Sequence, residues 1–230
     1  MLSGLWFAIH QAKLKGKNIF AFYNDKIEYA IKRKKIIEGK LQNALENDEL
    51  EIYYQPQICV ENNQLRGLEA LLRWISPELG NITPNEFIPI AEETGLINKI
   101  GEFVLKGACT QAKEWMDKGY SFETISVNIS PKQLRNRNFF DMVEKVLADS
   151  KLDSKYLEIE ITEGMLIQYI EQNSKLLEKL INKNIQISID DFGKGYSSLN
   201  YLTALPISTL KIDKSFIDKI CKDNRTLSIV

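Results

Sequence analysis

The chain alternates between segments in which every second residue is apolar and segments in which apolar residues recur every three or four positions. The first pattern is typical of β-strands and the second of α-helices. Before Leu50, the pattern predicts a helix over 4–15, a strand over 19–23, a polar linker over 24–35 and a helix over 36–48. From Leu50 onward, it predicts six strands, over 50–58, 65–74, 124–130, 156–162, 185–190 and 209–213. The helices expected among them lie within 84–118, over 131–149, 165–182 and 197–204, and from Ser215.

This repeated order of strand and helix predicts an α/β protein with a mainly parallel sheet, either doubly wound or a (β/α)₈ barrel. Strands covered on both faces are usually apolar throughout, but these strands alternate. In LEIEIT, Leu157, Ile159 and Ile161 share one face, while Glu158 and Glu160 share the other. The same alternation recurs in four other strands, so we interpret their polar faces as lining one lumen, with active groups at the carboxyl ends of the strands.

Several of these polar residues carry oxygen atoms near the ends of their strands. Asp190 and Asp191 are adjacent, at the expected boundary between a strand and a loop, where a pair of divalent cations would neutralise both carboxylates. Glu69, Asn128 and Glu160 lie on matching faces and would complete an oxygen-rich site of the kind that Mg²⁺ or Mn²⁺ prefers. Each residue alone could instead be an ordinary polar residue at a strand end, and Asp191 could cap the next helix.

Two basic residues and one loop are further candidates. Lys211 lies on the polar face of its strand, where it could hold a water near the metal ions or balance the acidic residues as an ion pair. Arg73 could bind a phosphate through its fork of donors, or could be an ordinary surface arginine. The segment FGKGYSS (192–198) could close over the site or form a plain turn between strand and helix.

Composition narrows the chemistry further. With 30 basic and 31 acidic residues the 230-residue chain has a formal net charge of −1, which gives no reason to expect nucleic-acid binding. Neither a membrane span nor a secretory signal is recognisable, so we expect a cytoplasmic protein, unless a part outside this sequence anchors it. The three scattered cysteines argue against structural zinc, and His10 is the only histidine. Catalysis would therefore depend on carboxylates, amides and lysines around a hard cation.

The residues around Glu69-Ala70-Leu71, in GLEALLRW, resemble the EAL domain, the cyclic di-GMP phosphodiesterase module of bacterial signalling. Further segments follow in the order and with the spacing of that family: YYQPQI, TPNEFIPIAEETGLI, SVNISPKQL, LEIEITEGM, IDDFGKGYSSLNYL and LPISTLKIDKSFI. The similarity extends without a break from about residue 32 to residue 230. It implies a modified (β/α)₈ barrel with an antiparallel first strand, of which about six strands are present here.

The resemblance also implies a role for each matching residue. The reaction would be hydrolysis of cyclic di-GMP to linear pGpG by a two-metal mechanism with Mg²⁺ or Mn²⁺. Lys211 would orient the attacking water, and Glu163 would hold the FGKGYSS loop. Gln55 and Arg73 would contact the dinucleotide. The implied metal ligands are Glu69, Asn128, Glu160, Asp190 and Asp191.

The family pattern also predicts what surrounds this domain, which would occupy 36–230. Residues 1–25 resemble the end of a GGDEF domain, with 26–35 as linker, and the last two barrel strands, with a further catalytic glutamate, are expected beyond this sequence. An incomplete barrel exposes apolar edges, which predicts oligomerisation or low solubility. The resemblance further implies a homodimer formed through the barrel and an adjoining GGDEF or sensor domain. An inactive EAL-type receptor for cyclic di-GMP and a purely structural scaffold are the alternatives.

Overall fold

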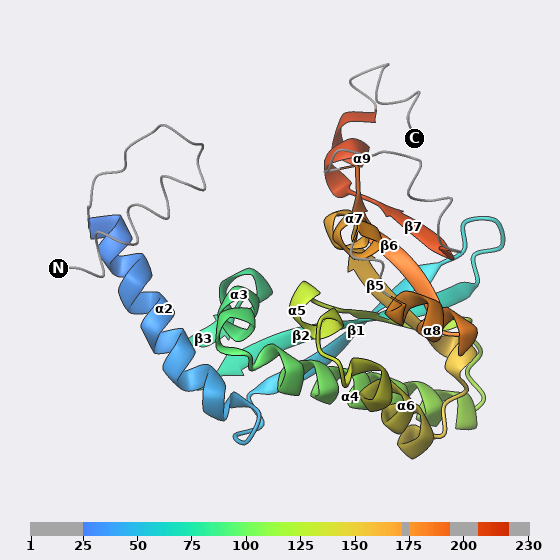
Figure 1. Cartoon of the computed structure of the whole chain (residues 1–230), viewed down its shortest axis with the longest axis horizontal. Helices are drawn as coiled ribbons and strands as arrows, with labels where there is room; N and C mark the ends of the chain where they lie inside the picture. The colour runs from blue at the N-terminus through green and yellow to red at the C-terminus, as the bar shows by residue number, and fades with distance from the viewer. Residues whose placement is uncertain (1–24, 172–174, 194–206, 221–230) are drawn as a thin grey trace. The chain divides into compact units, whose positions relative to one another are not determined.

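The computed structural model describes residues 25–171, 175–193 and 207–220 of the 230 (Figure 1). These residues belong to two compact units, one formed by the chain up to Glu51 together with Arg73–Leu96, the other by Ile52–Leu72 together with the chain from Ile97 onward. The candidate acidic site lies wholly in the second unit. The helix and strand predicted before residue 24, and the helix predicted over 197–204, lie outside the described residues.

The second unit is built on a parallel sheet with the strand order β1-β2-β4-β5-β6-β7. Five of these strands pair in parallel, β2 (Leu65–Ser76), β4 (Thr124–Asn128), β5 (Leu157–Thr162), β6 (Gln186–Phe192) and β7 (Thr209–Ile212). The sixth, β1 (Leu50–Ile58), is joined to its neighbour β2 by a short turn closed by a hydrogen bond from Cys59 N to Gln64 O (2.9 Å). Adjacent strands joined so closely must run antiparallel, which agrees with the predicted first strand.

The alternation seen in the sequence separates the two faces of this sheet. On β5, Leu157, Ile159 and Ile161 are buried on the face opposite to Glu158 and Glu160. Helix α4 (Ile97–Asp117) packs against β4, and α7 (Glu163–Glu171) and α8 (Leu176–Asn182) pack against β6. The apolar faces of the strands therefore form the core, and the polar faces are left to line the interior of the curved sheet.

The helix predicted over 131–149 is two helices in the structure, α5 (Pro131–Leu134) and α6 (Phe139–Ser150). The interruption at 135–138 has a local cause, because the Asn136 side chain accepts a hydrogen bond from the Asn138 amide (3.0 Å) and donates one to Asn98 (3.2 Å). Asparagine favours such turns over a continuing helix. The helix predicted over 165–182 likewise corresponds to α7 and α8, with 172–174 outside the described residues.

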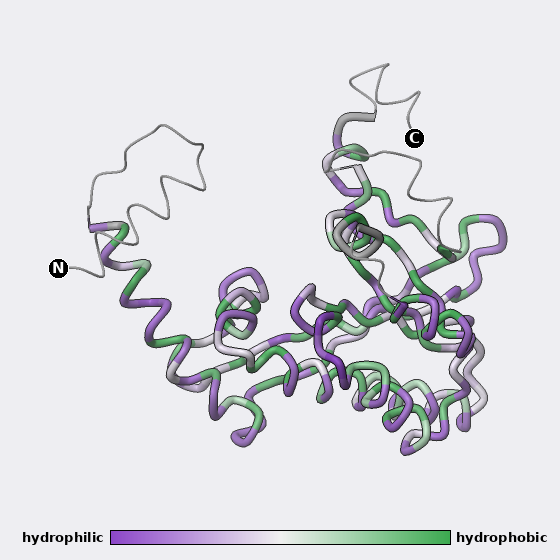
Figure 2. The backbone as a smooth tube through the Cα atoms, in the orientation of Figure 1, coloured by the Kyte–Doolittle hydropathy of each residue, from purple (hydrophilic) through white to green (hydrophobic). Residues whose placement is uncertain are grey.

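The first unit contains α2 (Asp25–Ala44), α3 (Pro84–Thr94) and the short strand β3 (Gly80–Ile82), which the sequence pattern did not reveal. Polar and apolar residues alternate along α2 in Figure 2, and the apolar ones include the buried residues Ile37 and Leu41. The predicted linker over 24–35 therefore continues into the following helix as one element from Asp25 to Ala44. Its role as a domain boundary stays a prediction. Across the described residues, no helix is both long enough and apolar enough to cross a membrane.

The β7 strand is the last in the described strand order. Its Leu210 and Ile212 side chains are exposed, in the way that the sequence predicts for the edge of an incomplete barrel. The predicted oligomerisation stays a prediction.

Candidate active site

The candidate site lies toward the carboxyl ends of the parallel strands of the second unit, although Glu69 is in the middle of β2, which continues to Ser76, and not near its end as expected. Asn128, the last residue of β4, is paired in register with Glu160 of β5, and Glu69 of β2 is paired with Ser126 of β4. Because these residues alternate onto the same face, the sheet brings together side chains that are distant in sequence. The amide of Asn128 donates a hydrogen bond from Nδ2 to Glu69 Oε1 (2.8 Å).

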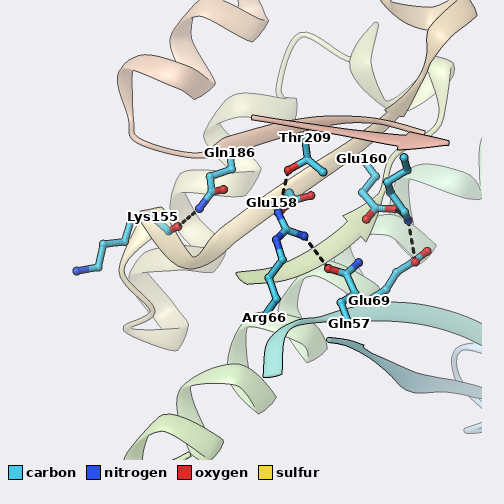
Figure 3. A network of polar contacts seen from close by, with 9 residues as sticks. Gln57, Arg66, Glu69, Lys155, Glu158, Glu160, Gln186 and Thr209 are labelled. Carbon is cyan, nitrogen blue, oxygen red and sulfur yellow. Dashed lines mark hydrogen bonds and ion pairs between the residues drawn. The ribbon is translucent and has the colours of Figure 1, made fainter. Parts of the chain in front are cut away.

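Lys211 joins three of the predicted acidic residues. Its ammonium group donates to Glu160 Oε2 (2.6 Å) and to Glu69 Oε2 (2.8 Å), and Asp190 Oδ1 lies 3.8 Å away. The Glu160 side chain is completely buried, whereas that of Lys211 is 23% exposed. Figure 3 shows Glu69 and Glu160 pointing toward each other from different strands. The structure thus brings together Glu69, Glu160, Asp190 and Lys211, and their roles stay predictions.

The contact between Lys211 and Glu69 also shows that the sheet is strongly curved. β2 and β7 are separated in the sheet by β4, β5 and β6, which is four strand spacings, or about 19 Å in a flat sheet. The two side chains could not meet across that distance. Their 2.8 Å hydrogen bond therefore requires the sheet to curl around a polar lumen, as the barrel interpretation predicts.

The paired aspartates lie in a β-bulge. The register between β6 and β7 shifts between Ile189, which is opposite Leu210, and Phe192, which is opposite Ile212. Asp190 and Asp191 therefore face the single residue Lys211, and Asp191 has a left-handed backbone with φ of 56°. Our expectation that the strand ends at Asp190 and that Asp191 begins a loop is wrong, because β6 continues to Phe192. The bulge is what lets adjacent carboxylates occupy one end of the sheet without pointing strictly to opposite faces.

Burial and neighbouring charges perturb both central groups. Burial raises the pKa of Glu160 to about 7, and the carboxylates of Glu69 and Asp190 add to this rise, while Lys211 opposes it. Burial acts to lower the pKa of Lys211, but Glu160 and Glu69 outweigh burial and raise it. Lys211 is therefore a cation over the whole neutral range, whereas the burial of Glu160 disfavours its carboxylate form, which a further cation would stabilise.

Glu163 lies where it can fix the start of the FGKGYSS segment. It is the first residue of α7, is buried, and accepts a hydrogen bond at Oε2 from the Gly193 amide (3.1 Å). Gly193 has a left-handed φ of 98°, and a Cβ atom placed there would lie 2.5 Å from the Phe216 ring of α9 (Lys214–Ile220). The predicted contact of Glu163 with this segment is seen at its first glycine, while 194–198 lie outside the described residues.

The two predicted substrate contacts occupy different parts of the fold. Gln55 is exposed on β1 in the second unit. Arg73 is half-buried on β2, four residues after Glu69, in the part of that strand that belongs to the first unit. Their contact with a dinucleotide stays a prediction.

The side chains at the site suit a hard cation, although they are arranged here around Lys211. Within the described residues, no three acidic, cysteine or histidine side chains are placed to hold a metal ion. The donors that converge are nonetheless carboxylate and amide oxygens, and the buried Glu160 Oε1 has no hydrogen-bond partner in the described structure. Asn128 turns its NH₂ group to Glu69, so its carbonyl oxygen remains as a candidate ligand.

A second polar cluster occupies the opposite, amino-terminal ends of the same strands. Arg66 donates to Gln57 Oε1 (3.0 Å) and Thr209 Oγ1 (2.8 Å) and forms an ion pair with Glu158 (3.4 Å) (Figure 3). We did not predict this cluster. The polar face of β5 includes Glu158, but the sequence does not show that Arg66 reaches it from a strand two places away in the sheet.

Comparison with known proteins agrees with this geometry. Residues 38–230 match the family model described as the EAL domain. The chain is 40% identical over 223 residues to the bifunctional diguanylate cyclase/cyclic di-GMP phosphodiesterase MucR of Pseudomonas aeruginosa, which covers 97% of this chain and 33% of that protein. It is 41% identical over 213 residues to the signaling protein YkoW of Bacillus subtilis, covering 93% of this chain and 26% of that protein. The chain thus spans a third or less of the length of these relatives.

Solved structures with a similar fold point to the same family. A structure of the PaMucR phosphodiesterase in complex with c-di-GMP superimposes with a TM-score of 0.80 at 42% identity and covers 84% of this chain and 78% of that one. The EAL enzyme Bd1971, in a form bound to cAMP and cyclic di-GMP, gives a TM-score of 0.77 at 32% identity, covering 99% of this chain and 61% of that one.

Proposed function

Because the chain belongs to the EAL domain family, we propose that it hydrolyses one phosphodiester bond of cyclic di-GMP to give linear pGpG. The observation that carries the proposal is the cluster in which Lys211 joins Glu69, Glu160 and Asp190 from three other strands. Several relatives, among them the cyclic di-GMP phosphodiesterases NbdA and PdeR, are named for this activity. The ligand of the MucR structure supplies the substrate class.

The oxygen donors of the cluster would hold two Mg²⁺ or Mn²⁺ ions. We assign this role to Glu69, Asn128, Glu160, Asp190 and Asp191. When bound, such ions activate water and stabilise charge on the leaving oxygen. The pKa of about 7 at Glu160 supports this assignment, since a buried carboxylate with an unsatisfied oxygen gains from a nearby cation.

Lys211 would orient the attacking water. An ammonium group has three N–H donors, and two of them are directed to Glu160 and Glu69. Among the described residues no hydrogen bond uses the third donor, which would bind the water, with Asp190 3.8 Å away. Since the pKa of Lys211 is raised, it would act as a fixed hydrogen-bond donor and would not itself remove a proton.

Three further residues would act on the substrate and on the loop. Gln55 and Arg73 would bind the dinucleotide, Arg73 through its guanidinium group. Glu163, which accepts the Gly193 amide, would set the path of the segment that follows the aspartates. We further propose that the chain acts as a homodimer formed through the barrel. It would lie beside a GGDEF or sensor domain, since it covers only 33% of its relative MucR.

Chromatographic detection of pGpG after incubation of this chain with cyclic di-GMP and Mn²⁺ tests the proposal. Glu69→Gln should abolish turnover, whereas Glu61→Gln, in the exposed turn after β1, should leave it intact. Binding of cyclic di-GMP should be measured on the same samples by calorimetry. Binding without turnover by the unaltered chain would favour the receptor alternative for this chain, and neither binding nor turnover would refute the proposal.

A further inference from the structure

The hydrogen bond from Arg66 to Thr209 crosses the lumen between the same two strands as the hydrogen bond from Lys211 to Glu69. Arg66 reaches from β2 to Thr209 on β7, and Lys211 reaches from β7 to Glu69 on β2. β2 and β7 are not neighbours in the sheet. Two side-chain contacts, one at each end of the strands, therefore join the same two distant strands.

The two contacts lie on the same strands only a few residues apart. Thr209 and Lys211 occupy the same face of β7, two residues apart, and so about 7 Å along the strand. Arg66 and Glu69 are three residues apart on β2. A shift of β7 at the level of Thr209 is therefore transmitted directly to the lysine that holds the acidic cluster.

The contact of Arg66 with Thr209 is well suited to fix the distance between β2 and β7. The Glu158 side chain is completely buried, so its carboxylate holds the guanidinium group in the lumen. The planar fork of Arg66 then presents separate nitrogens to Gln57 and to Thr209. A lysine would keep the charge but could not reproduce this fixed pair of directions.

We propose that Arg66 and Thr209 are positioning residues, which hold β7 against β2 so that Lys211 is kept between Glu69 and Glu160. The geometric part of this inference stands without any activity, and its catalytic consequence rests on the proposed function.

The sharpest test is Thr209→Val, which removes the acceptor of Arg66 and preserves side-chain shape and the Arg66–Glu158 ion pair. Thr209→Ser restores the hydroxyl group. Thr124→Val is the control for the same substitution, because Thr124 lies in β4, the strand beside β2, and its buried hydroxyl group has no hydrogen-bond partner among the described residues. Arg66→Lys gives a second, independent perturbation.

Two measurements report whether Lys211 is displaced in these variants. Competitive labelling with isotopic acetic anhydride, read by mass spectrometry, reports the accessibility of the Lys211 amine without any need for turnover. In Thr209→Val we expect its labelling rate to rise severalfold, and Thr209→Ser and Thr124→Val should keep the original rate. In hydrolysis assays kcat should fall about tenfold with KM within twofold, the effect of losing one hydrogen bond from a charged donor.

The outcomes separate the two claims. Faster Lys211 labelling in Thr209→Val and in Arg66→Lys, absent from Thr124→Val, supports the inference even if no variant, nor the unaltered chain, hydrolyses cyclic di-GMP. Unchanged labelling in Thr209→Val overturns it, as does an equal rise in Thr124→Val. A fall in kcat that Thr209→Ser does not restore would overturn the catalytic part.

Discussion

Glu160→Gln should make the metal-free protein more stable at pH 8. Glu160 is 1% exposed, and its pKa is raised from 4.5 to about 7, first by burial and then by the nearby acidic residues Glu69 and Asp190. At pH 8 the fold therefore holds a carboxylate that it accommodates poorly. Glutamine has nearly the same shape and no charge, and it can still accept a hydrogen bond from Lys211.

The magnitude follows from linkage between protonation and folding. Between pH 4.5 and about 7 the native state retains the proton that the unfolded chain has lost. The free energy of unfolding attributable to Glu160 therefore falls as the pH rises through this window, by up to about 3 kcal/mol. In Glu160→Gln this fall is absent, so the variant and the parent should have similar stability at pH 4.5 and differ by up to about 3 kcal/mol at pH 8.

Urea denaturation in EDTA at pH 4.5, 6, 7 and 8 measures the difference. The control is Glu158→Gln, the same substitution two residues earlier on the same face of β5. It removes the ion-pair partner of Arg66, and so should lower stability by about 1–2 kcal/mol at pH 8. If Glu160→Gln were no more stable than the parent at pH 8, the carboxylate would be well accommodated by Lys211 and the reasoning would be refuted.

Three other predictions concern the fold around the site. Mn²⁺ in hundredfold excess over its dissociation constant should stabilise the protein by about 2.7 kcal/mol, reversibly with EDTA, and no shift in melting temperature would argue against a metal site. Gly193→Ala should cost more stability than Gly80→Ala, since both have positive φ but only Gly193 abuts the Phe216 ring; equal losses in thermal melts would contradict this. Gly101→Ala should cost at least about 1–3 kcal/mol, because its Cβ would lie 1.8 Å from the Gln133 amide, and much of the loss should disappear in a Gln133→Ala background, as urea midpoints would show.

Much of the site could be predicted because the faces of a strand are fixed by parity. Glu160 and Asn128 lie on the polar faces of β5 and β4, and the register of parallel strands then places them side by side. Neither conclusion needs knowledge of the loops. The charged member Lys211 could be placed in the same way, although only the structure shows that it bridges Glu69 and Glu160 instead of lying beside them.

Other features depend on contacts that a periodic pattern does not encode. The interruption of the helix after Leu134 comes from the hydrogen bonds of one asparagine side chain, in a segment whose apolar spacing continues to suggest a helix. Strand β3, at three residues, is too short to show any period. The contact of Arg66 with Thr209 depends on the curvature of the whole sheet, which is a property of six strands together.

The bulge at Asp190 and Asp191 makes the chemistry of this end of the sheet depend on chain length as well as on residue identity. A substitution at Asp190 or Asp191 removes one carboxylate but keeps the bulge that positions the other carboxylate. Deletion of one residue between Ile189 and Phe192 would instead restore a regular ladder, in which Phe192 stays opposite Ile212 and a single carboxylate faces Lys211. A single-residue deletion here therefore removes the bulge together with one carboxylate, so it should lower activity more than Asp190→Asn or Asp191→Asn, which keep the bulge.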